Sequence, residues 1–282
     1  MENKRILVTG ATSGIGRETV RGLAKKGAQI IVMSRNEQKC RETVDELNDT
    51  TGRSDADYFV ADLSIMDDIR SAAEKFQEKY DRLDVLLNNA GAIFTSRQET
   101  PDGYEKTLAL NHLNYFLLTN LLLDTLRDSA PSRIVNVASG AHYGNDIDFD
   151  DLQREQSYSG YKVYGESKLM NILFTYELDR RLDTDDVTAN ALHPGFVASN
   201  FGHNNSLPVR ILMSLTQLFA RSEKKGAETS IYLASSPDVE GVSGKYFSDK
   251  KPKESSPQSY DEKTARRLWE VSEELVGLEM TI

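Results

Sequence analysis

A tyrosine and a lysine four residues apart, Tyr164 and Lys168, are the residues of this sequence best suited to chemistry. On a helix, this spacing places both side chains on one face, one turn apart. The ammonium group would favour the phenolate and lower the tyrosine pKa from about 10 by ~1–3 units. Such a tyrosine can exchange a proton with a substrate oxygen near neutral pH. The pair therefore predicts general acid–base catalysis, although an aromatic and a charge on a helix surface would look the same.

A second pair with this spacing, Tyr158 and Lys162, comes shortly before the first. Gly160 interrupts this earlier pair, and residues 157–160 are typical of a loop. Tyr164 instead begins a long helical pattern, which continues through Leu169, Ile172, Leu173 and Tyr176. We therefore assign the chemistry to Tyr164 and Lys168.

Two polar residues could assist this pair. Ser139 follows an apolar run at residues 134–138, at the end of a predicted strand where open α/β sheets bind ligands. Its hydroxyl could bond a substrate carbonyl and the tyrosine, and the alternative is an ordinary turn serine. Asn111 lies in a long helical pattern, where asparagine is mildly unfavourable, which slightly favours a functional role over a tolerated polar residue.

A glycine-rich turn follows the first predicted strand, with the sequence Thr9-Gly10-Ala11-Thr12-Ser13-Gly14-Ile15-Gly16. The backbone N–H groups at the start of the next helix could bind a pyrophosphate. The spacing G-x-x-x-G-x-G differs from the dinucleotide fingerprint G-x-G-x-x-G but keeps its strand–turn–helix context. An ordinary glycine-rich turn is the alternative.

Position 35 indicates which dinucleotide would bind. NAD-binding folds place an acidic residue about 20 positions after the glycine turn, whereas NADP-binding folds need a cation there for the 2′-phosphate. Arg35 ends the second predicted strand, and Arg17 directly follows the turn. A guanidinium group can bind a phosphate with paired hydrogen bonds. The two arginines predict NADP(H), unless both are solvated surface residues.

These residues must be held by a parallel sheet, because apolar runs of strand length alternate with helical patterns along the whole chain. The predicted strands are residues 5–9, 28–34, 57–61, 85–88, 134–138, 187–192 and 244–247. The predicted helices are residues 15–26, 37–48, 66–80, 104–126, 163–182 and 224–234. We expect an α/β, doubly wound Rossmann-type fold, with a seven-stranded parallel sheet and helices on both faces, as one domain over residues 1–282.

Two segments depart from this alternation, and a C-terminal helix follows them. Residues 199–222 are predicted to form a lid over the substrate, with a short apolar helix at 209–219, although core packing or a partner-facing helix would give the same pattern. Residues 250–259 are polar and are predicted to form a surface loop. Residues 261–275, which include Trp269, are predicted to form a C-terminal amphipathic helix.

Composition excludes several classes of function. The 282 residues carry a net charge of −10, which makes nucleic acid an unlikely partner because phosphates would be repelled. One cysteine and four scattered histidines show no metal-ligand spacing, so a zinc dehydrogenase is disfavoured. The apolar stretch ending at Gly10 is too short for a signal peptide or membrane span. The expected location is the cytoplasm, without a stable membrane anchor.

Several of these motifs occur in the order typical of one family. TGATSGIG at 9–16, NNAG at 88–91, Ser139, the Tyr164–Lys168 pair and Pro194-Gly195 give the chain a resemblance to the short-chain dehydrogenase/reductase family. The resemblance covers nearly the whole chain. Residues 243–247 and 256–275 look like the retinol dehydrogenase-like branch in particular. The interval from Ser139 to Tyr164 is longer than usual in the family and contains an acidic insert at 146–151. This insert could form one rim of the substrate cleft or be a solvated loop, and we expect no direct chemical role for it.

The resemblance implies roles for individual residues. Tyr164 would be the general acid/base, with Lys168 lowering its pKa and contacting the cofactor ribose, Ser139 orienting the substrate, and Asn111 holding a proton-relaying water at a helix kink. Asp62 would read the adenine, and His193 would be structural. Ser199 stands where the family usually has threonine and keeps the hydroxyl. The implied cofactor contacts are Gly10, Thr12, Ser13, Gly14, Ile15, Gly16, Arg17, Arg35, Asp62, Leu63, Asn89, Ala90, Gly91, Tyr164, Lys168, Pro194, Gly195, Val197 and Ser199.

Together, these residues predict an NADP(H)-dependent oxidoreductase that interconverts a lipophilic aldehyde or ketone and its alcohol. One alternative is a non-catalytic NADP(H)-sensing protein on the same fold, although none of the key side chains is missing. Another is a membrane-associated retinoid enzyme whose lid touches lipid. The resemblance also implies a homodimer or homotetramer formed through the helices at 104–126 and 163–182.

Overall fold

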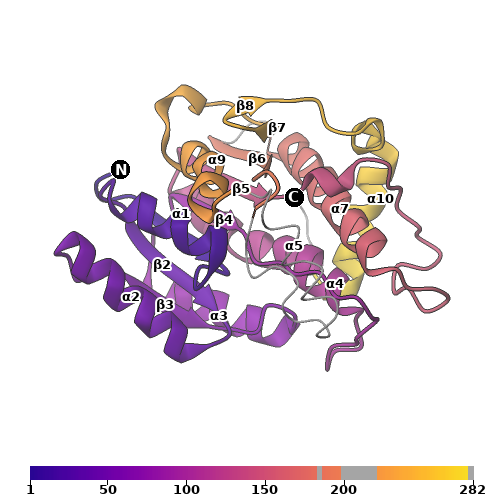
Figure 1. The fold of residues 1–282 in the computed structure, drawn as a ribbon, viewed down its shortest axis with the longest axis horizontal. Coiled ribbons are helices and arrows are strands. Elements are labelled where there is room, and N and C mark those ends of the chain that lie inside the picture. Colours follow the sequence, from indigo (N-terminus) through magenta and orange to yellow (C-terminus); the bar gives the residue numbers. More distant parts are fainter. Residues whose placement is uncertain (183–185, 198–220, 279–282) are drawn as a thin grey trace.

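Short apolar runs form a single sheet within residues 1–182, 186–197 and 221–278, which the computed structural model describes (Figure 1). The strand order is β3-β2-β1-β4-β5-β6-β7-β8, and all neighbours from β3 to β7 pair in parallel. The doubly wound arrangement is confirmed. The strands are β1 (Arg5–Thr9), β2 (Gln29–Ser34), β3 (Asp57–Val60), β4 (Val85–Asn88), β5 (Ser132–Val137), β6 (Val187–His193), β7 (Lys245–Ser248) and β8 (Lys251–Pro252).

The sheet has eight strands, so the expected seven-stranded, wholly parallel sheet is corrected at one edge. Asp249 and Lys250 both have positive φ, of 51° and 63°, and reverse the chain directly after β7. Such a turn allows two antiparallel strands to pair. The two residues of β8 pair antiparallel with the end of β7, inside the segment 250–259 that was predicted to be a loop. A two-residue strand containing a proline carries no apolar pattern by which it could be predicted.

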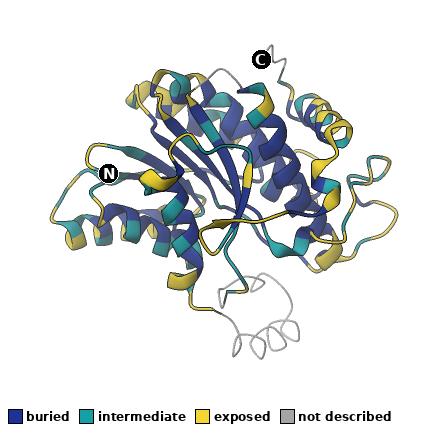
Figure 2. Ribbon diagram, turned by 90° about the horizontal axis from the view of Figure 1, so that it is seen from above, coloured by how far each residue is buried: buried dark blue, intermediate teal, exposed yellow. Residues whose placement is uncertain are grey.

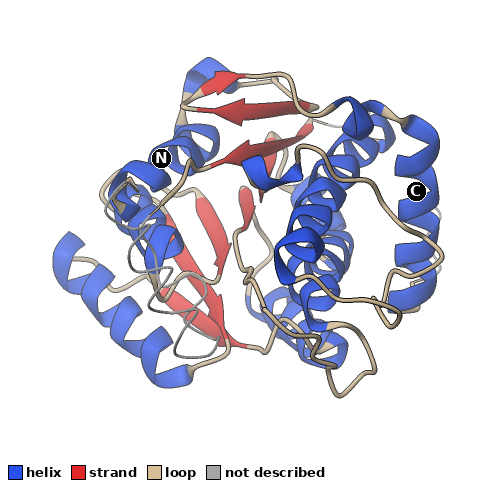
Figure 3. Cartoon of the chain, turned by 45° about the vertical axis from the view of Figure 1, so that its right-hand side comes forward, coloured by secondary structure: helices blue, strands red, loops and turns tan. Residues whose placement is uncertain are grey.

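Helices cover both faces of this sheet (Figure 3). Residues of α1, α2 and α9 form one apolar core with alternate strand residues such as Ile6 and Val8. Residues of α3, α5, α7 and α10 form another core with residues such as Leu7. The helices are α1 (Gly14–Ala24), α2 (Glu37–Thr51), α3 (Met66–Lys79), α4 (Lys106–Leu108), α5 (Asn114–Leu121), α6 (Leu123–Asp128), α7 (Gly160–Arg181), α9 (Glu223–Ser235) and α10 (Glu262–Val276). The central strands β1, β2, β4, β5 and β6 and the inner sides of the helices are largely buried, whereas β3 and β8 at the two edges of the sheet are not (Figure 2).

The continuous helix expected at 104–126 is broken in the structure. A π-helix (Ala109–Leu113) separates α4 from α5, and α6 follows Leu122. The π-helix places the side chain of Asn111 against the backbone of Ala92. The N–H of Ala92 donates a hydrogen bond to this side chain, and the carbonyl of Ala92 accepts one from it. This contact between distant parts of the chain explains why the helical pattern alone predicted no interruption.

Helix α7 begins at Gly160, which the sequence pattern had placed in a loop. A Cβ at this position would lie 2.2 Å from the carbonyl oxygen of Phe94. Glycine therefore allows the helix to start against another loop rather than ending it. Tyr158 still precedes α7, whose N-cap is Ser159, whereas Tyr164 and Lys168 both lie on the helix.

Helix α10 lies where a C-terminal helix was expected. The predicted lid falls outside the described residues, except for Arg221 and Ser222. Within the described ranges, no helix is both long and apolar enough to cross a membrane.

Candidate active site

The predicted site residues follow the carboxyl ends of parallel strands, which meet at one edge of the sheet. Gly10 follows β1, Asn89 follows β4, Ser139 lies two residues after β5, and Pro194 follows β6. The strand order reverses between β1 and β4, and open α/β sheets bind ligands beside such a switch point. The fold therefore brings the glycine turn and the predicted catalytic residues to the same edge.

The turns after β1 and β4 are locked together by Thr9. Its hydroxyl oxygen accepts the N–H groups of Asn89 and Ala90, at 2.9 and 3.0 Å. The side-chain amide of Asn89 donates to the carbonyl of Thr9 at 2.9 Å. A Cβ on Gly10 would lie 2.9 Å from the Cα of Ala90, so only glycine permits this approach. Thr9 was not among the predicted site residues, although it begins the glycine motif.

The N-terminus of α1 is suited to an anion. Ser13 caps the helix without a side-chain hydrogen bond to it and is exposed. Gly14 has a φ of +56°, and a Cβ on Gly16 would lie 2.4 Å from the carbonyl oxygen of Gly10. The backbone can therefore turn tightly into the helix and leave its first N–H groups accessible to a phosphate.

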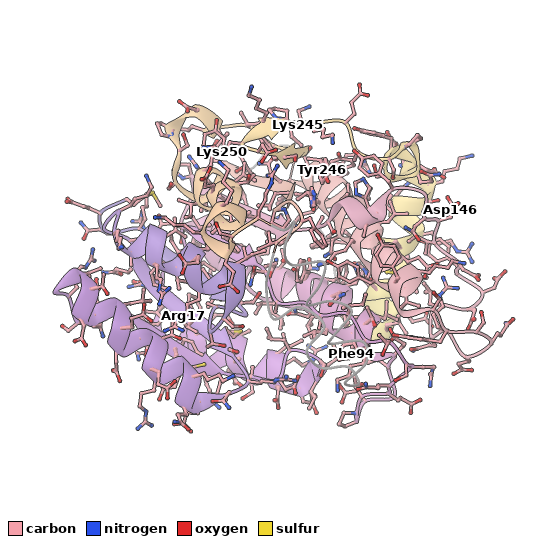
Figure 4. All side chains as sticks on the ribbon, in the orientation of Figure 1. Arg17, Phe94, Asp146, Lys245, Tyr246 and Lys250 are labelled. Carbon is pink, nitrogen blue, oxygen red and sulfur yellow. The ribbon has the colours of Figure 1, made fainter. Side chains whose placement is uncertain are left out.

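The two arginines expected at the 2′-phosphate differ in their surroundings. Arg35 is exposed directly after β2, and among the described residues its side chain has no hydrogen-bond or ion-pair partner. Next to it, the hydroxyls of Thr12 and Ser34 lie 3.4 Å apart. Arg17, labelled in Figure 4, instead forms an ion pair with Glu46 of α2. Arg35 is therefore free to bind an anion, whereas Arg17 would first have to leave its partner.

The turn after β3 contains the two residues expected near an adenine. The Oδ1 atom of Asp62 accepts hydrogen bonds from the N–H and the hydroxyl of Ser64, at 3.0 and 2.7 Å. Leu63 is buried. Ser64 thus fixes the orientation of the Asp62 carboxylate.

Tyr164 and Lys168 lie together in the interior of the site. Their exposed fractions are 8% and 3%, and the lysine Nζ lies 5.7 Å from the centre of the tyrosine ring. Lys168 donates a hydrogen bond to the carbonyl of Val137, at 2.9 Å. Tyr164 also forms a side-chain hydrogen bond with Ser139. The structure therefore brings together the tyrosine, the lysine and the serine that were predicted to act together.

The electrostatics of this pair differ from the expected lowering of the tyrosine pKa. Burial raises the pKa of Tyr164 to about 12, although the hydrogen bond with Ser139 opposes this shift. Burial also lowers the pKa of Lys168 to about 7. The sequence argument assumed a charged lysine, whereas desolvation favours the neutral form of both groups. In the ligand-free chain Tyr164 is thus a protonated acid.

The alternative tyrosine, Tyr158, lies in a different environment. Its hydroxyl donates to the carbonyl of Phe94 at 3.2 Å and lies 3.1 Å from the hydroxyl of Thr107. Lys162 is largely exposed and pairs with Glu166 instead. Tyr158 therefore joins the loop before α7 to Phe94 and Thr107, and the lysine four residues after it is turned to another partner.

Asn111 fixes the turn beside Lys168. Its Oδ1 accepts the N–H of Ala92 at 2.9 Å, and its Nδ2 donates to the carbonyl of Ala92 and to the hydroxyl of Ser167. A Cβ on Gly91 would lie 3.1 Å from Asn111 Oδ1 and 3.4 Å from Lys168 Nζ. The side chain of Asn111 is therefore occupied by protein partners, and it positions Gly91 against the lysine.

Two histidines hold the turn that carries Ser139. His193 Nδ1 accepts the N–H of Gly140 at 3.0 Å, and burial lowers its pKa to about 4. His142 Nδ1 lies 2.6 Å from the carbonyl of Ser139, while its Nε2 accepts the N–H of Ser256 at 3.0 Å. With this pattern, His142 donates from Nδ1. His193 has the structural role expected of it, but no local pattern singles out His142.

The turn after β6 closes toward the start of α1. Gly195 has a φ of +86°, and Val197 forms a parallel bridge with Arg221. A Cβ on Gly226 would lie 2.6 Å from Val197 and 3.3 Å from Ile15, so these two side chains approach the same point. Val197 thus lies near Ile15 of the glycine motif, Pro194 and Gly195 precede it in the same turn, and Ser199 lies outside the described residues.

Tyr115 is a further member of the site that sequence analysis did not identify. It is fully buried, and its hydroxyl donates to the carbonyl of Val137 at 3.3 Å. Lys168 Nζ lies 5.4 Å from the centre of its ring and shares the same carbonyl. The sequence offered one signal for it: Tyr115 lies four residues after Asn111, and residues with this spacing lie on the same face of a helix.

The acidic insert is anchored rather than fully solvated. Its Asp146 is exposed near α7 (Figure 4), but Ile147 and Phe149 pack against the core. Arg154, only 6% exposed, pairs with Asp148 at 3.2 Å and with the buried Glu166 of α7 at 2.8 Å. The insert is thereby fastened to the helix that carries Tyr164 and Lys168.

Comparisons with known proteins agree with this geometry. The family model of short chain dehydrogenases matches residues 4–208. Human retinol dehydrogenase 14 is 44% identical, over 99% of this chain and 88% of that protein. The crystal structure of an uncharacterised protein from Mycobacterium paratuberculosis is 30% identical with a TM-score of 0.81, covering 100% of this chain and 96% of that one.

A structure with a bound nucleotide is also similar. The Pseudomonas aeruginosa RhlG/NADP active-site complex is 26% identical with a TM-score of 0.70, covering 88% of this chain and 94% of that one. The family match and the high identity to the human protein settle the class of this chain. It belongs to the short-chain dehydrogenase family and is an oxidoreductase similar to the retinol dehydrogenases.

Proposed function

We propose that this chain is an NADP(H)-dependent oxidoreductase that interconverts a lipophilic aldehyde or ketone and its alcohol, with Tyr164 as the general acid/base. The observation that carries the proposal is the meeting of Tyr164, Ser139 and Lys168 at the ligand-binding edge of the sheet. The turn after β4 supports it as well, because Gly91 lies close to both Asn111 and the same lysine.

The residues present fit nicotinamide adenine dinucleotide phosphate, NADP(H). The free N-terminus of α1 suits a pyrophosphate, and the unpartnered Arg35 beside Thr12 and Ser34 suits a 2′-phosphate. The remaining contacts would come from the turns after β3, β4 and β6. When bound, this cofactor supplies the hydride for carbonyl reduction or accepts it from the alcohol.

The protein side chains provide the proton and hold the substrate. In reduction, Tyr164 donates its phenolic proton to the substrate oxygen, and its raised pKa keeps that proton in place beforehand. Ser139 stabilises the charge developing on the same oxygen by a hydrogen bond. Lys168, when protonated, favours the phenolate that remains on Tyr164. Asn111 and Tyr115 position the lysine and the turn next to it.

An apolar substrate is supported by exposed aromatic residues around this edge. Tyr161, one turn before Tyr164 on α7, is 71% exposed, and Phe196, in the turn after β6, is 60% exposed. Tyr143, after the Ser139 turn, is 43% exposed. Aromatic side chains that water surrounds are suited to covering an apolar ligand. Because the human relative is named a retinol dehydrogenase, we propose retinal-like aldehydes as the first candidate substrates.

Thermal unfolding with and without cofactor, followed by turnover, tests the proposal. We expect saturating NADPH to raise the Tm more than NADH does, because a ligand at a hundred times its Kd adds ~2.7 kcal/mol to the free energy of unfolding. NADPH consumption with a panel of aldehydes and ketones should then identify the substrate. Stabilisation by NADPH without turnover of any member would favour the non-catalytic sensor instead. Location in the cytoplasm stays a prediction from the sequence.

A further inference from the structure

Helix α7 is buried on every side. All of its residues from 163 to 178 are buried, and so are residues 114–120 of α5. A helix that only lies on a sheet leaves its outer side in water, so burial all round requires a neighbour on the outer side as well. We call this outer surface, marked by His112, Phe116 and Phe174, the α5/α7 face.

Helix α10 covers the α5/α7 face. Its buried residues recur at helical spacing and form one stripe, whereas the rest of its surface is charged and exposed. In Figures 1 and 3, α10 lies beside α7 at the outer edge of the molecule. Asp261 caps its start, and Gly277 ends it in the left-handed conformation. The buried stripe consists of Ala265, Leu268, Trp269, Ser272 and Val276.

The contact is specific as well as apolar. The Trp269 ring lies edge-on to Phe116, with centroids 4.9 Å apart, and stacks on Phe174 at 5.7 Å. The guanidinium group of Arg181 lies 4.3 Å from the Trp269 ring centre.

Hydrogen bonds fix α10 at several points along its length. The Ser272 hydroxyl lies 2.8 Å from Nε2 of the buried His112, in the π-helix that carries Asn111. Near the end of α10, Tyr104 donates to the carbonyl of Leu275 and Arg70 donates to that of Val276. These bonds join the helix to the π-helix and to α3, so α10 is part of the packed fold.

We propose that α10 fills, within one chain, the place that a second copy would take on the α5/α7 face. The chain then forms no dimer through these two helices, which are the ones through which the family resemblance implied pairing. Pairing there would require α10 to leave and would expose Trp269 and Leu268 to water. The charged outer surface of α10 offers no comparable apolar stripe. This inference rests on packing and is independent of the proposed reaction.

The fluorescence of Trp269 tests the proposal, because it is the only tryptophan of the chain. Sedimentation and acrylamide quenching are measured on the full chain, without cofactor, from low to high micromolar concentration. We expect weak, concentration-independent quenching, whether the chain sediments as a monomer or associates through another surface. An association that shifts the emission to the red, or raises the quenching constant several-fold, would overturn the proposal.

A pair of variants tests the same face directly. Leu268→Asp places a carboxylate in the buried stripe of α10, so we expect release of α10, a several-fold rise in quenching and self-association through the uncovered face. Arg266→Asp changes an exposed residue of the same helix and should alter neither quantity. Shielded Trp269 and an unchanged mass in Leu268→Asp would contradict the proposal. If this variant fails to fold, the wild-type concentration series decides.

Discussion

Replacing Arg35 with alanine should weaken the binding of NADPH much more than that of NADH. Arg35 is exposed and has no partner among the described residues, so its removal breaks no contact of the ligand-free protein. Hydrogen bonds to charged groups contribute ~1.5–3 kcal/mol, which corresponds to a rise of about 10- to 100-fold in the Kd for NADPH. NADH lacks the 2′-phosphate and should bind as before. Arg35→Asp should go further, because the carboxylate repels the phosphate.

Isothermal titration calorimetry with each nucleotide measures this preference. Arg17→Ala should have a smaller effect than Arg35→Ala, because the Arg17 guanidinium is already paired with Glu46. Arg41→Ala is the matched control, since Arg41 is an exposed arginine further along α2, where it pairs with Glu37 at 3.1 Å. Equal losses for NADPH and NADH, or no loss in Arg35→Ala, would refute the assignment of Arg35 to the phosphate.

Three single variants and one double variant test the catalytic residues and their support. Ser139→Ala should lower kcat by about 10²-fold, as expected for a lost oxyanion donor. The Kd for NADPH, measured by calorimetry, should stay unchanged. An unaltered kcat would remove Ser139 from the reaction. Lys168→Met should abolish turnover yet stabilise the ligand-free chain at neutral pH by up to ~4 kcal/mol, because the lysine pKa falls to about 7 in the folded state but stays near 10.4 in the unfolded state. Wild-type stability in urea should therefore rise between these pH values, and the same rise in Lys168→Met would contradict this origin. Arg154→Met should lower the free energy of unfolding by about 3 kcal/mol, because it leaves Glu166 buried without its main partner. Arg154→Met/Glu166→Leu should recover most of that loss. Equal urea midpoints for the single and double variants would show that the buried charge is not the cause.

The sheet could be predicted from the sequence because strands buried on both faces are continuous apolar runs. Residues 30–33, for example, are all apolar, and each is buried in β2. The glycine turn and Ser139 each follow a predicted parallel strand, so they could be expected at the same edge of the sheet, and the family resemblance added the Tyr164–Lys168 pair. These features are local in sequence or follow from the parallel topology.

The features that could not be predicted depend on contacts between distant residues. The helical pattern at 104–126 shows no interruption, and only the family resemblance implied a kink at Asn111, where the π-helix bonds this side chain to Ala92. The start of α7 at Gly160 depends on the backbone of Phe94. Similarly, the pairing of Arg17 with Glu46 of α2 is invisible from the spacing that suggested a phosphate contact.

The pKa values were mispredicted for a related reason. Spacing alone indicates that a tyrosine and a lysine are close, but it does not show how deeply both are buried. At 8% and 3% exposure, desolvation dominates, and it favours the neutral form of each group. The sign of the shift on Tyr164 therefore depended on the fold as a whole.

The most direct test of the reaction is the turnover of Tyr164→Phe beside that of Tyr158→Phe, each with NADPH and a carbonyl substrate that the wild type reduces. Loss of a general acid costs about 10²–10⁴-fold, so Tyr164→Phe should lose at least 10²-fold in kcat while its Kd for NADPH is unchanged. Tyr158→Phe should keep wild-type kcat, because its hydroxyl bonds Phe94, Glu105 and Thr107 and has no contact with Ser139 or Lys168 among those that the structure describes. Retained turnover in Tyr164→Phe would contradict the assignment of Tyr164 as the proton donor.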